Sequence, residues 1–285
     1  YPFSSATGVA LEDMSTGTTQ LVAANVDDTA SVVTNIGFDF WYHGVRHTQF
    51  SVNANGLLRL GSTVISTAFD NSTGFVTATN APKIAPYFDD IFTGTNGKVH
   101  FKVTGTAPNR KLIVEWLNMQ IPLVGAGSPG AGTFQLWLFE STGLIQTVYG
   151  SGMAVNAANG GYSIGLNIGT PVANNTASVT TTGATVSYAA ANNTQTNAIT
   201  AGDSYSFTPP VPTAPSGLNF TAVTAVGMTL NWTDNSSDEF LFIIERSLDG
   251  TNFSSFATAA ANATSLVAPG LTPGTNYFWR VYAVS

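Results

Sequence analysis

Residues 36–60 alternate between apolar and polar side chains with a period of two, and this pattern constrains the fold more than any other feature of the chain. Phe38 and Phe40 fall on one side of an extended segment, whereas Asp39 falls on the other. The dipeptide Asn55-Gly56 can supply the positive φ that a tight hairpin turn requires. The stretch therefore predicts three antiparallel strands in succession, with the last turn at Asn55-Gly56.

The chain up to residue 208 continues as short strand patterns separated by turn residues. Nowhere do apolar residues recur at helical spacing over a window long enough for a helix. We therefore predict an all-β fold, with a large antiparallel β-sandwich or jelly-roll-like domain over residues 1–208. The segments YPFS at residues 1–4 and YSFT at residues 205–208 echo each other, which suits first and last strands that lie near each other.

Two segments of this domain are expected to lie outside the strand ladders. Residues 62–80 are rich in Thr and Ser, which indicates a loop. Residues 81–90 contain Pro82 and Pro86. Because proline has no N–H to donate, we expect this segment to stay out of any central ladder.

Residues 209–215, PPVPTAP, predict a stiff, extended linker and a domain boundary. Six strand patterns follow over residues 216–285. The lead-in PTAP, the strand motif LNW that ends at Trp232, and the segment LTPGTNY that ends at Tyr277 resemble a fibronectin type III domain. The resemblance covers residues 212–285. It implies an immunoglobulin-like sandwich in which Trp232 packs in the core and Tyr277 bonds back to the backbone as a tyrosine corner.

This second domain departs from the family in its strand number. Fibronectin type III domains have seven strands, and the sixth pattern here reaches Ser285. Either the chain continues beyond Ser285, which is the simpler explanation, or a neighbouring subunit supplies the strand. In the second case residues 276–284 form an acceptor edge and residues 1–10 form the donor. The edge residues are Asn276, Phe278, Arg280, Tyr282 and Val284, and the donor residues are Tyr1, Phe3 and Ser5.

The first domain also resembles a known group. The segments GFDFWYHG, FSVNANGLLRLG, IAPYFDDI and TAPNRKLIVEW look like the N-terminal β-sandwich of secreted surface proteins of Bacteroidetes-type bacteria, the cargo of type IX secretion. The resemblance covers residues 1–208. It implies a role at the cell surface or in the extracellular matrix, and it brings no catalytic residues.

Charge and composition narrow the classes of partner. Charged residues make up 9% of the chain and the net charge is −7, which is poorly suited to phosphate backbones, so we predict no nucleic acid partner. The absence of cysteine excludes thiol catalysis and zinc-thiolate sites. A surface rich in Thr, Ser, Asn and Gly suits an extracellular protein, exported through a removed signal peptide. No apolar run approaches the roughly 20 residues of a membrane span.

Oxygen ligands suited to Ca²⁺ occur in two groups. The first is Asp89 and Asp90, with Asn96 nearby. The second comprises acidic residues in turns: Glu12, Asp13, Asp27 and Asp28. Neither group has the spacing of an EF-hand or a repeat calcium loop, so solvated carboxylates are the simpler interpretation and calcium is the alternative.

Hydrolase chemistry finds little support. The motif GYSIG at residues 161–165 matches G-x-S-x-G, but a helix does not follow it, as a nucleophile elbow requires. Glu115 and Glu140 could form a glycosidase pair if the fold brought them together. Trp41, Trp116 and Trp137 could build a platform for sugars, although Trp in a β-sandwich more often packs in the core.

The sequence therefore leaves three functions open. The first is a non-catalytic extracellular protein that self-associates, or joins other surface proteins, into head-to-tail filaments by strand addition. The second is a carbohydrate-binding or adhesion module of a larger exported protein, with glycans as partners. The third, a secreted hydrolase, has no catalytic residues to assign, so we predict a protein that is not an enzyme and needs no cofactor apart from the calcium alternative.

Overall fold

The computed structural model describes residues 1–122, 130–155, 160–169, 175–180, 183 and 185–284. The chain forms two compact units, which are described separately. The first comprises Tyr1–Phe40 and Arg46–Thr208, and the second comprises Trp41–Val45 and Pro209–Ser285.

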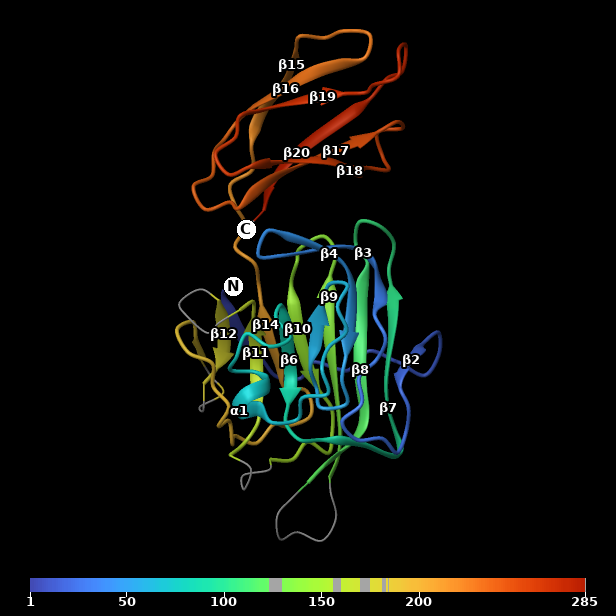
Figure 1. Cartoon of the computed structure of the whole chain (residues 1–285), viewed down its shortest axis with the longest axis vertical. Helices are drawn as coiled ribbons and strands as arrows, with labels where there is room; N and C mark the ends of the chain where they lie inside the picture. The colour runs from blue at the N-terminus through green and yellow to red at the C-terminus, as the bar shows by residue number, and fades with distance from the viewer. Residues whose placement is uncertain (123–129, 156–159, 170–174, 181–182, 184, 285) are drawn as a thin grey trace. The chain divides into compact units, whose positions relative to one another are not determined.

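Two antiparallel sheets form the first unit (Figure 1). Sheet I has the strand order β1-β14-β10-β9-β8-β7-β2, and sheet II has the order β13-β12-β11-β6-β5-β4-β3. The strands are β1 (Phe3–Ala6), β2 (Thr19–Val22), β3 (Thr34–Tyr42), β4 (Val45–Val52), β5 (Leu58–Leu60), β6 (Lys83–Phe88), β7 (Phe92–Thr104), β8 (Lys111–Ile121), β9 (Gly130–Phe139), β10 (Ile145–Tyr149), β11 (Ser163–Asn167), β12 (Thr176–Val179), β13 (Val186–Ser187) and β14 (Ser204–Phe207). The predicted all-β class is confirmed.

Aromatic side chains fill the core between the two sheets. The ring of Trp116 from β8 stacks on Phe134 from β9 at 5.2 Å, and Tyr87 from β6 packs against the same Phe134 at 5.7 Å. Trp116 Nε1 also donates a 2.9 Å hydrogen bond to the Asn53 carbonyl of the opposite sheet. Fully buried polar atoms of large aromatics need such a partner, so this bond fixes how the two sheets face each other.

The outer faces of both sheets are covered as well. Met14 packs on Ile113 and Trp137 of sheet I, and Phe75 packs on Leu57 of sheet II. Strands buried on both faces lose the apolar and polar alternation of half-exposed strands, which explains the continuous apolar run LIV in β8.

The first and last strands of this unit pair with each other, as their similar sequences predicted. Phe3 of β1 lies opposite Phe207 of β14, and Ala6 lies opposite Ser204. The segment proposed as a donor strand therefore already completes the edge of its own sheet.

The predicted turn at Asn55-Gly56 is also confirmed. Gly56 has a φ of +85°, and a Cβ built on it would lie 1.7 Å from the Tyr87 carbonyl oxygen. Only glycine fits here, because the turn must come this close to β6.

The prediction that prolines keep residues 81–90 out of the centre of a sheet is wrong. β6 contains Pro86 and lies between β11 and β5. Its register against β11 shifts between Ser163 and Gly165, and its pairing with β5 involves only Ile84 and Lys83. Pro86 therefore sits at a bulge where no ladder partner requires its missing N–H.

Residues 62–80 were predicted to form a loop, and they hold one short helix, α1 (Asn71–Gly74). This segment supplies Ile65 and Phe75 to the cover of sheet II. Among the described residues no helix is long and apolar enough to cross a membrane.

The second unit is a sandwich of two three-stranded sheets, with the orders β15-β16-β19 and β18-β17-β20. The six predicted strands are β15 (Ser216–Thr221), β16 (Gly227–Thr233), β17 (Leu241–Ser247), β18 (Ser254–Ala260), β19 (Ser265–Pro269) and β20 (Phe278–Val284). Trp232 is 4% exposed and its ring packs 5.5 Å from that of Phe242. The Thr272 N–H donates to the Tyr277 hydroxyl oxygen at 3.0 Å. Both contacts agree with the roles that the family resemblance implied for Trp232 and Tyr277.

Candidate functional site

Sheet I is irregular around Asn118 of β8, in the part of the strand that pairs with β7. β7 pairs Thr93 with Met119 and Lys98 with Leu117, so residues 94–97 bulge opposite Asn118 alone. On its other side, β8 shifts register against β9 between Trp116 and Met119. Bulges re-aim side chains and are common beside binding sites. The sheet is therefore irregular on both sides of Asn118.

Asn118 itself adopts a left-handed backbone conformation, with a φ of +49°. Its N–H donates to the Thr133 hydroxyl at 3.1 Å, and its side-chain Nδ2 donates to the Asn96 carbonyl at 3.2 Å. Conformations of this kind persist only where neighbouring contacts hold them, and they cluster at functional sites.

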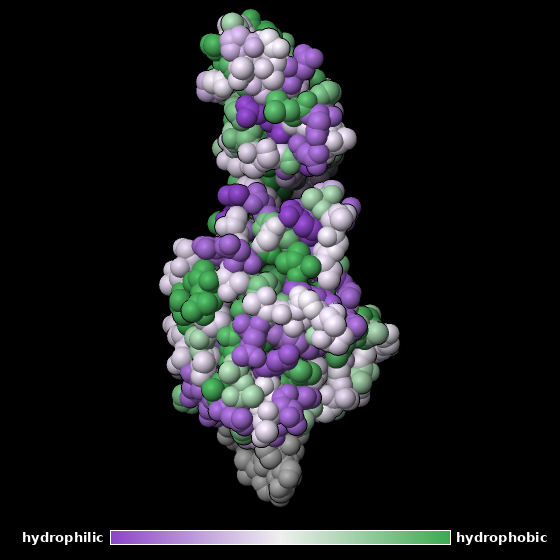
Figure 2. Space-filling view, turned by 90° about the vertical axis from the view of Figure 1, so that its right-hand side faces the viewer, coloured by the Kyte–Doolittle hydropathy of each residue, from purple (hydrophilic) through white to green (hydrophobic). Residues whose placement is uncertain are grey.

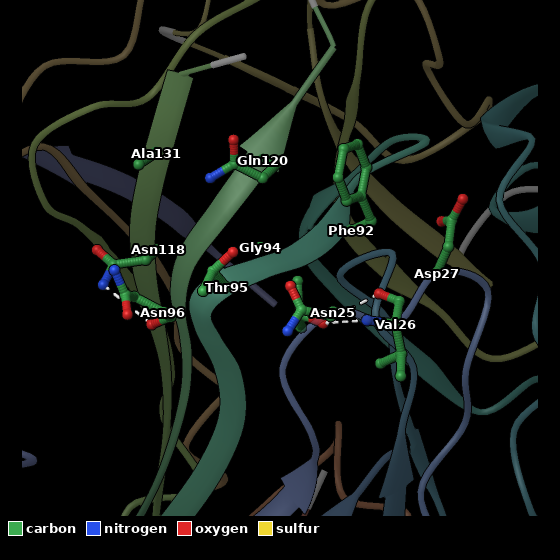
Figure 3. Close-up of a pocket in the computed structure, with 11 residues that line it drawn as sticks. Asn25, Val26, Asp27, Phe92, Gly94, Thr95, Asn96, Asn118, Gln120 and Ala131 are labelled. Atoms are coloured by element: carbon green, nitrogen blue, oxygen red, sulfur yellow. Dashed lines mark hydrogen bonds between the residues drawn. The ribbon is translucent and has the colours of Figure 1, made fainter. Parts of the chain in front are cut away.

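The bulge opens into a wide pocket of about 810 Å³. A pocket of this volume falls within the roughly 300–1,000 Å³ range of ligand sites. Figure 3 shows Asn96 and Asn118 close together, with Asp27 at the opposite end. The lining residues are Asn25, Val26, Asp27, Phe92, Thr93, Gly94, Thr95, Asn96, Asn118, Gln120 and Ala131.

Amide side chains dominate the polar lining of this pocket, which we call the bulge pocket. Within the described part of the chain, the side-chain amides of Asn25, Asn96 and Gln120 make no hydrogen bond. Each therefore has two donor hydrogens and an acceptor oxygen available to a ligand. Phe92, at the start of β7, adds an aromatic surface to the same wall.

A cluster of carboxylates adjoins the bulge pocket through Asp27. The carboxylate oxygens of Asp27, Asp28 and Asp90 lie within 4.8 Å of one another. Burial raises the pKa of Asp90 above its usual value, and the charges of Asp27 and Asp28 raise it further. Three like charges held this close repel one another unless a proton or a cation joins them.

Asn55 brings these carboxylates together from distant parts of the sequence. Its Nδ2 donates to Asp28 at 2.8 Å, its Oδ1 accepts from the Ile91 N–H at 3.0 Å, and its carbonyl accepts from the Asp89 N–H at 3.3 Å. Asn55 is fully buried. The Asn55-Gly56 turn thus ties the loop after β2 to the connection between β6 and β7.

Asp89 is the sequence neighbour of Asp90 and is itself buried. It is 2% exposed, its Oδ1 accepts the Asp90 N–H at 2.9 Å, and its Oδ2 has no hydrogen-bond partner. Burial raises the pKa of Asp89 to about 7. Asp89 and Asp90 together line a second cavity of about 210 Å³, whose other walls are Phe69, Asp70 and Asn71.

The structure separates the other calcium candidates from this cluster. Asn96 lies on the wall of the bulge pocket. Glu12 forms an ion pair with Lys111, and Asp13 accepts the Ser15 N–H at 2.9 Å. Of the seven candidate residues in the sequence, Asp27, Asp28 and Asp90 are the ones whose oxygens meet, and Asp89 adjoins them.

The hydrolase candidates do not assemble. Glu115 bonds to His100 at 2.6 Å in the sheet, whereas Glu140, just after β9, accepts from Arg110, just before β8. Because Glu115 lies opposite Gln135, Glu140 is five residues further along the ladder, or roughly 17 Å, which exceeds the separation in glycosidases. Ser163 of the G-x-S-x-G motif is fully buried at the start of β11.

The three candidate platform tryptophans are not grouped in the bulge pocket. Trp116 is fully buried and Trp137 is 7% exposed, so both belong to the core. Trp41 lies in β3 and is half-buried.

The strand predicted to form an acceptor edge, β20, lies at the edge of its sheet in the second unit. β20 pairs with β17, and among the described residues no strand pairs with its other side. Phe278, Arg280, Tyr282 and Val284 belong to β20, whereas Asn276 precedes it. Arg280 forms an ion pair with Glu245, and the Tyr282 hydroxyl lies 3.3 Å from the same carboxylate. These side chains therefore brace β20 against β17 and leave the backbone of the outer edge accessible.

Of the unpaired amides of the bulge pocket, the sequence pointed to Asn96 alone, and to that residue only as a calcium ligand. Gly94 and Gly97 flank Asn96 inside an otherwise regular strand pattern, and glycine within a strand is a signal for a bulge. That signal could have located the pocket. It could not have placed Asn25 or Gln120 there, because they reach it from other segments.

Comparisons with known proteins match both domains. The family model described as NIDO related matches residues 1–209, and the model of the fibronectin type III domain matches residues 213–285. No curated protein matches the sequence. The likeness of the first domain to bacterial surface proteins stays a prediction.

Two solved structures give distant likenesses. A two-domain fibronectin type III segment of chicken tenascin is 12% identical and covers 65% of this chain and 89% of its own, with a TM-score of 0.24. A β-1,2-glucanase from Parabacteroides distasonis is 15% identical and covers 70% of this chain and 33% of its own, with a TM-score of 0.22. At these scores neither carries an argument about function.

Proposed function

Because this chain belongs to the NIDO-related family and carries a fibronectin type III domain after that region, we propose that it is an adhesion protein whose first domain binds a neutral oligosaccharide. The two domains indicate an extracellular adhesive or structural module. The class of ligand is inferred from the bulge pocket. Display at a cell surface after export through a removed signal peptide is part of the same proposal.

The observation that carries the proposal is the set of unpaired amides around an aromatic side chain. Asn25, Asn96 and Gln120 can each donate to and accept from sugar hydroxyls, which have both properties themselves. Phe92 can pack against the apolar face of a pyranose ring. A few convergent polar groups beside an apolar surface are typical of a small-molecule site.

Charge favours a neutral ligand over an acidic one. Asp27 lies at one end of the pocket, and the chain carries a net charge of −7. Like charges disfavour the approach of sialylated or sulfated glycans. On the face drawn in Figure 2, hydrophilic and hydrophobic residues are intermixed.

A glycan array with the full chain, followed by titration calorimetry of the best neutral oligosaccharide, tests this function. Gln120→Ala should weaken binding about fivefold, since one hydrogen bond contributes on the order of 1 kcal/mol. Gln146→Ala is the matched control, because Gln146 is also half-buried on sheet I but lies on β10, outside the pocket. Equal loss in both variants, or an array that retains acidic glycans alone, would contradict the proposal.

A second candidate function is self-assembly by strand addition, which the unpaired outer side of β20 favours. An extended segment of another molecule could add to this edge through backbone hydrogen bonds. If β1 is the donor, it must first leave β14, where it pairs from Phe3 to Ala6. Assembly would therefore carry the cost of breaking that ladder.

Negative-stain electron microscopy of the chain, with and without residues 1–6, tests this second function. Filaments that disappear on deletion of residues 1–6 would support donation by β1. Filaments that form equally well without β1, or dispersed monomers at every concentration, would contradict it.

A further inference from the structure

The carboxylates of Asp27, Asp28 and Asp90 are spaced as ligands of one cation. Two oxygens on opposite sides of Ca²⁺, each at about 2.4 Å, lie about 4.8 Å apart. The oxygens of these three residues lie within 4.8 Å of one another, so they are near enough to contact one ion together.

No basic side chain of the described residues neutralises this cluster. The ion pairs of the described residues join other acids, namely Asp39, Glu115, Glu140, Glu12 and Glu245. Asp28 accepts an uncharged amide donor from Asn55, and Asp27 accepts the Asp28 N–H at 3.0 Å. The negative charge therefore remains uncompensated by the protein itself.

Asp89 gives a second, independent indication of a ligand. Its Oδ2 is buried without a hydrogen-bond partner, although a buried carboxylate oxygen normally has one. Asp89 lines the 210 Å³ cavity together with Asp90, so its buried carboxylate borders the same space as one member of the cluster. An ion or its bound water in that space would satisfy the orphaned oxygen.

We propose that Asp27, Asp28 and Asp90 bind a divalent cation of the Ca²⁺ type, with Asp89 as a further ligand or as the acceptor for a metal-bound water. The donor set consists of carboxylate oxygens, without the imidazole or thiolate that would favour zinc or copper. The site is partly exposed and sits between loops, which suits the flexible coordination of Ca²⁺ better than the strict octahedron of Mg²⁺.

A bound cation would join two segments that are distant in the sequence. Asp27 and Asp28 belong to the loop after β2, whereas Asp89 and Asp90 form the crossing from β6 to β7. An ion held by all of them would fasten the crossing between the sheets to that loop. This inference does not depend on the oligosaccharide, because its test measures calcium binding without a sugar, although Asp27 borders both sites.

Calorimetry of the full chain with CaCl₂ alone, after removal of metal with EDTA, tests the proposal. We expect one saturable site with a Kd of about 10⁻⁴–10⁻³ M, as in extracellular calcium modules. Asp90→Asn should weaken binding at least tenfold. Asp13→Asn is the control, because Asp13 is an exposed turn carboxylate outside the cluster, and it should bind calcium as the wild type does.

Thermal unfolding provides a readout that a merely structural role of Asp90 would not reproduce. In EDTA, Asp90→Asn should unfold at a higher temperature than the wild type, since one repelling charge is removed. With millimolar CaCl₂ the order should reverse, because binding stabilises the wild type alone. Absence of a saturable heat, or an Asp90→Asn variant that responds to calcium like the wild type, would overturn the proposal.

Discussion

Lys83 is a fully buried lysine whose loss should destabilise the first domain. Its ammonium group donates to three backbone carbonyls, those of Gly74, Thr77 and Thr79, at 2.5, 2.7 and 2.6 Å. These carbonyls belong to α1 and the segment after it, which covers sheet II. Lys83 therefore holds the covering segment on the sheet by satisfying groups that the segment cannot satisfy itself.

The cost of Lys83→Met follows from the carbonyls that lose their donor. Thr77 keeps a second donor, Asn167 Nδ2 at 3.3 Å, and Thr79 is exposed, so water can replace the lysine there. The Gly74 carbonyl is buried and has no substitute. One buried unsatisfied carbonyl costs about 1–3 kcal/mol, and methionine retains the apolar packing of the stem. We expect the free energy of unfolding to fall by about 1–3 kcal/mol near pH 10, where the lysine is uncharged in the folded chain.

The difference in the free energy of unfolding between the wild type and Lys83→Met should also depend on pH. Burial lowers the pKa of Lys83 from 10.5 to about 7 in the folded chain. Between these values the unfolded chain holds a proton that the folded chain has released, so the stability of the wild type rises with pH. Below about pH 7 the Lys83 side chain is protonated in both the folded and the unfolded chain, and its buried charge then lowers the stability of the wild type the most. The deficit of Lys83→Met should therefore widen as the pH rises from about 7 towards 10.

Urea denaturation followed by tryptophan fluorescence measures this deficit. Lys98→Met is the control, because Lys98 lies half-buried on β7 without a side-chain hydrogen bond or ion pair, and it should leave the midpoint nearly unchanged. A Lys83→Met variant as stable as Lys98→Met at every pH would refute the reasoning.

Two further predictions concern turns. Gly56→Ala should lower the free energy of unfolding by more than about 3 kcal/mol or prevent folding, because its Cβ would meet the Tyr87 carbonyl. Gly8→Ala has a similar positive φ of +76° but open space around it, so it should lower the free energy of unfolding by only about 1 kcal/mol. Thermal unfolding of both variants separates the effect of the clash from that of the backbone strain. Tyr277→Phe removes the hydroxyl that accepts the Thr272 N–H, so calorimetric unfolding of the second domain should shift to lower temperature while that of the first domain stays unchanged.

The sequence indicated those features of the fold that depend on neighbouring residues. Alternation over residues 36–60 and the Asn55-Gly56 turn predicted strands that the structure contains. The family motifs around Trp232 and Tyr277 predicted the second domain. Pro86 was misread because its tolerance in a central strand depends on a bulge against β11, and bulges arise from pairing between distant segments.

The candidate sites depended more strongly on distant pairing. Asp27 and Asp90 were both recognised as possible ligands, but their meeting depends on Asn55, which bonds to both segments. The bulge pocket draws Asn25 and Gln120 from separate elements, and no local pattern marks either residue. The sequence shows which residues have amide side chains, but their meeting in the bulge pocket depends on the register of β7 against β8.

The most direct test of the central claim is a ¹⁵N-edited NMR titration of the full chain with the neutral oligosaccharide selected on the array. Side-chain amide signals report on the groups that are proposed to bind. The account predicts that the signals of Asn25, Asn96 and Gln120 shift with the same saturation curve, while that of Gln146 stays in place. Shifts confined to residues outside the bulge pocket would contradict it.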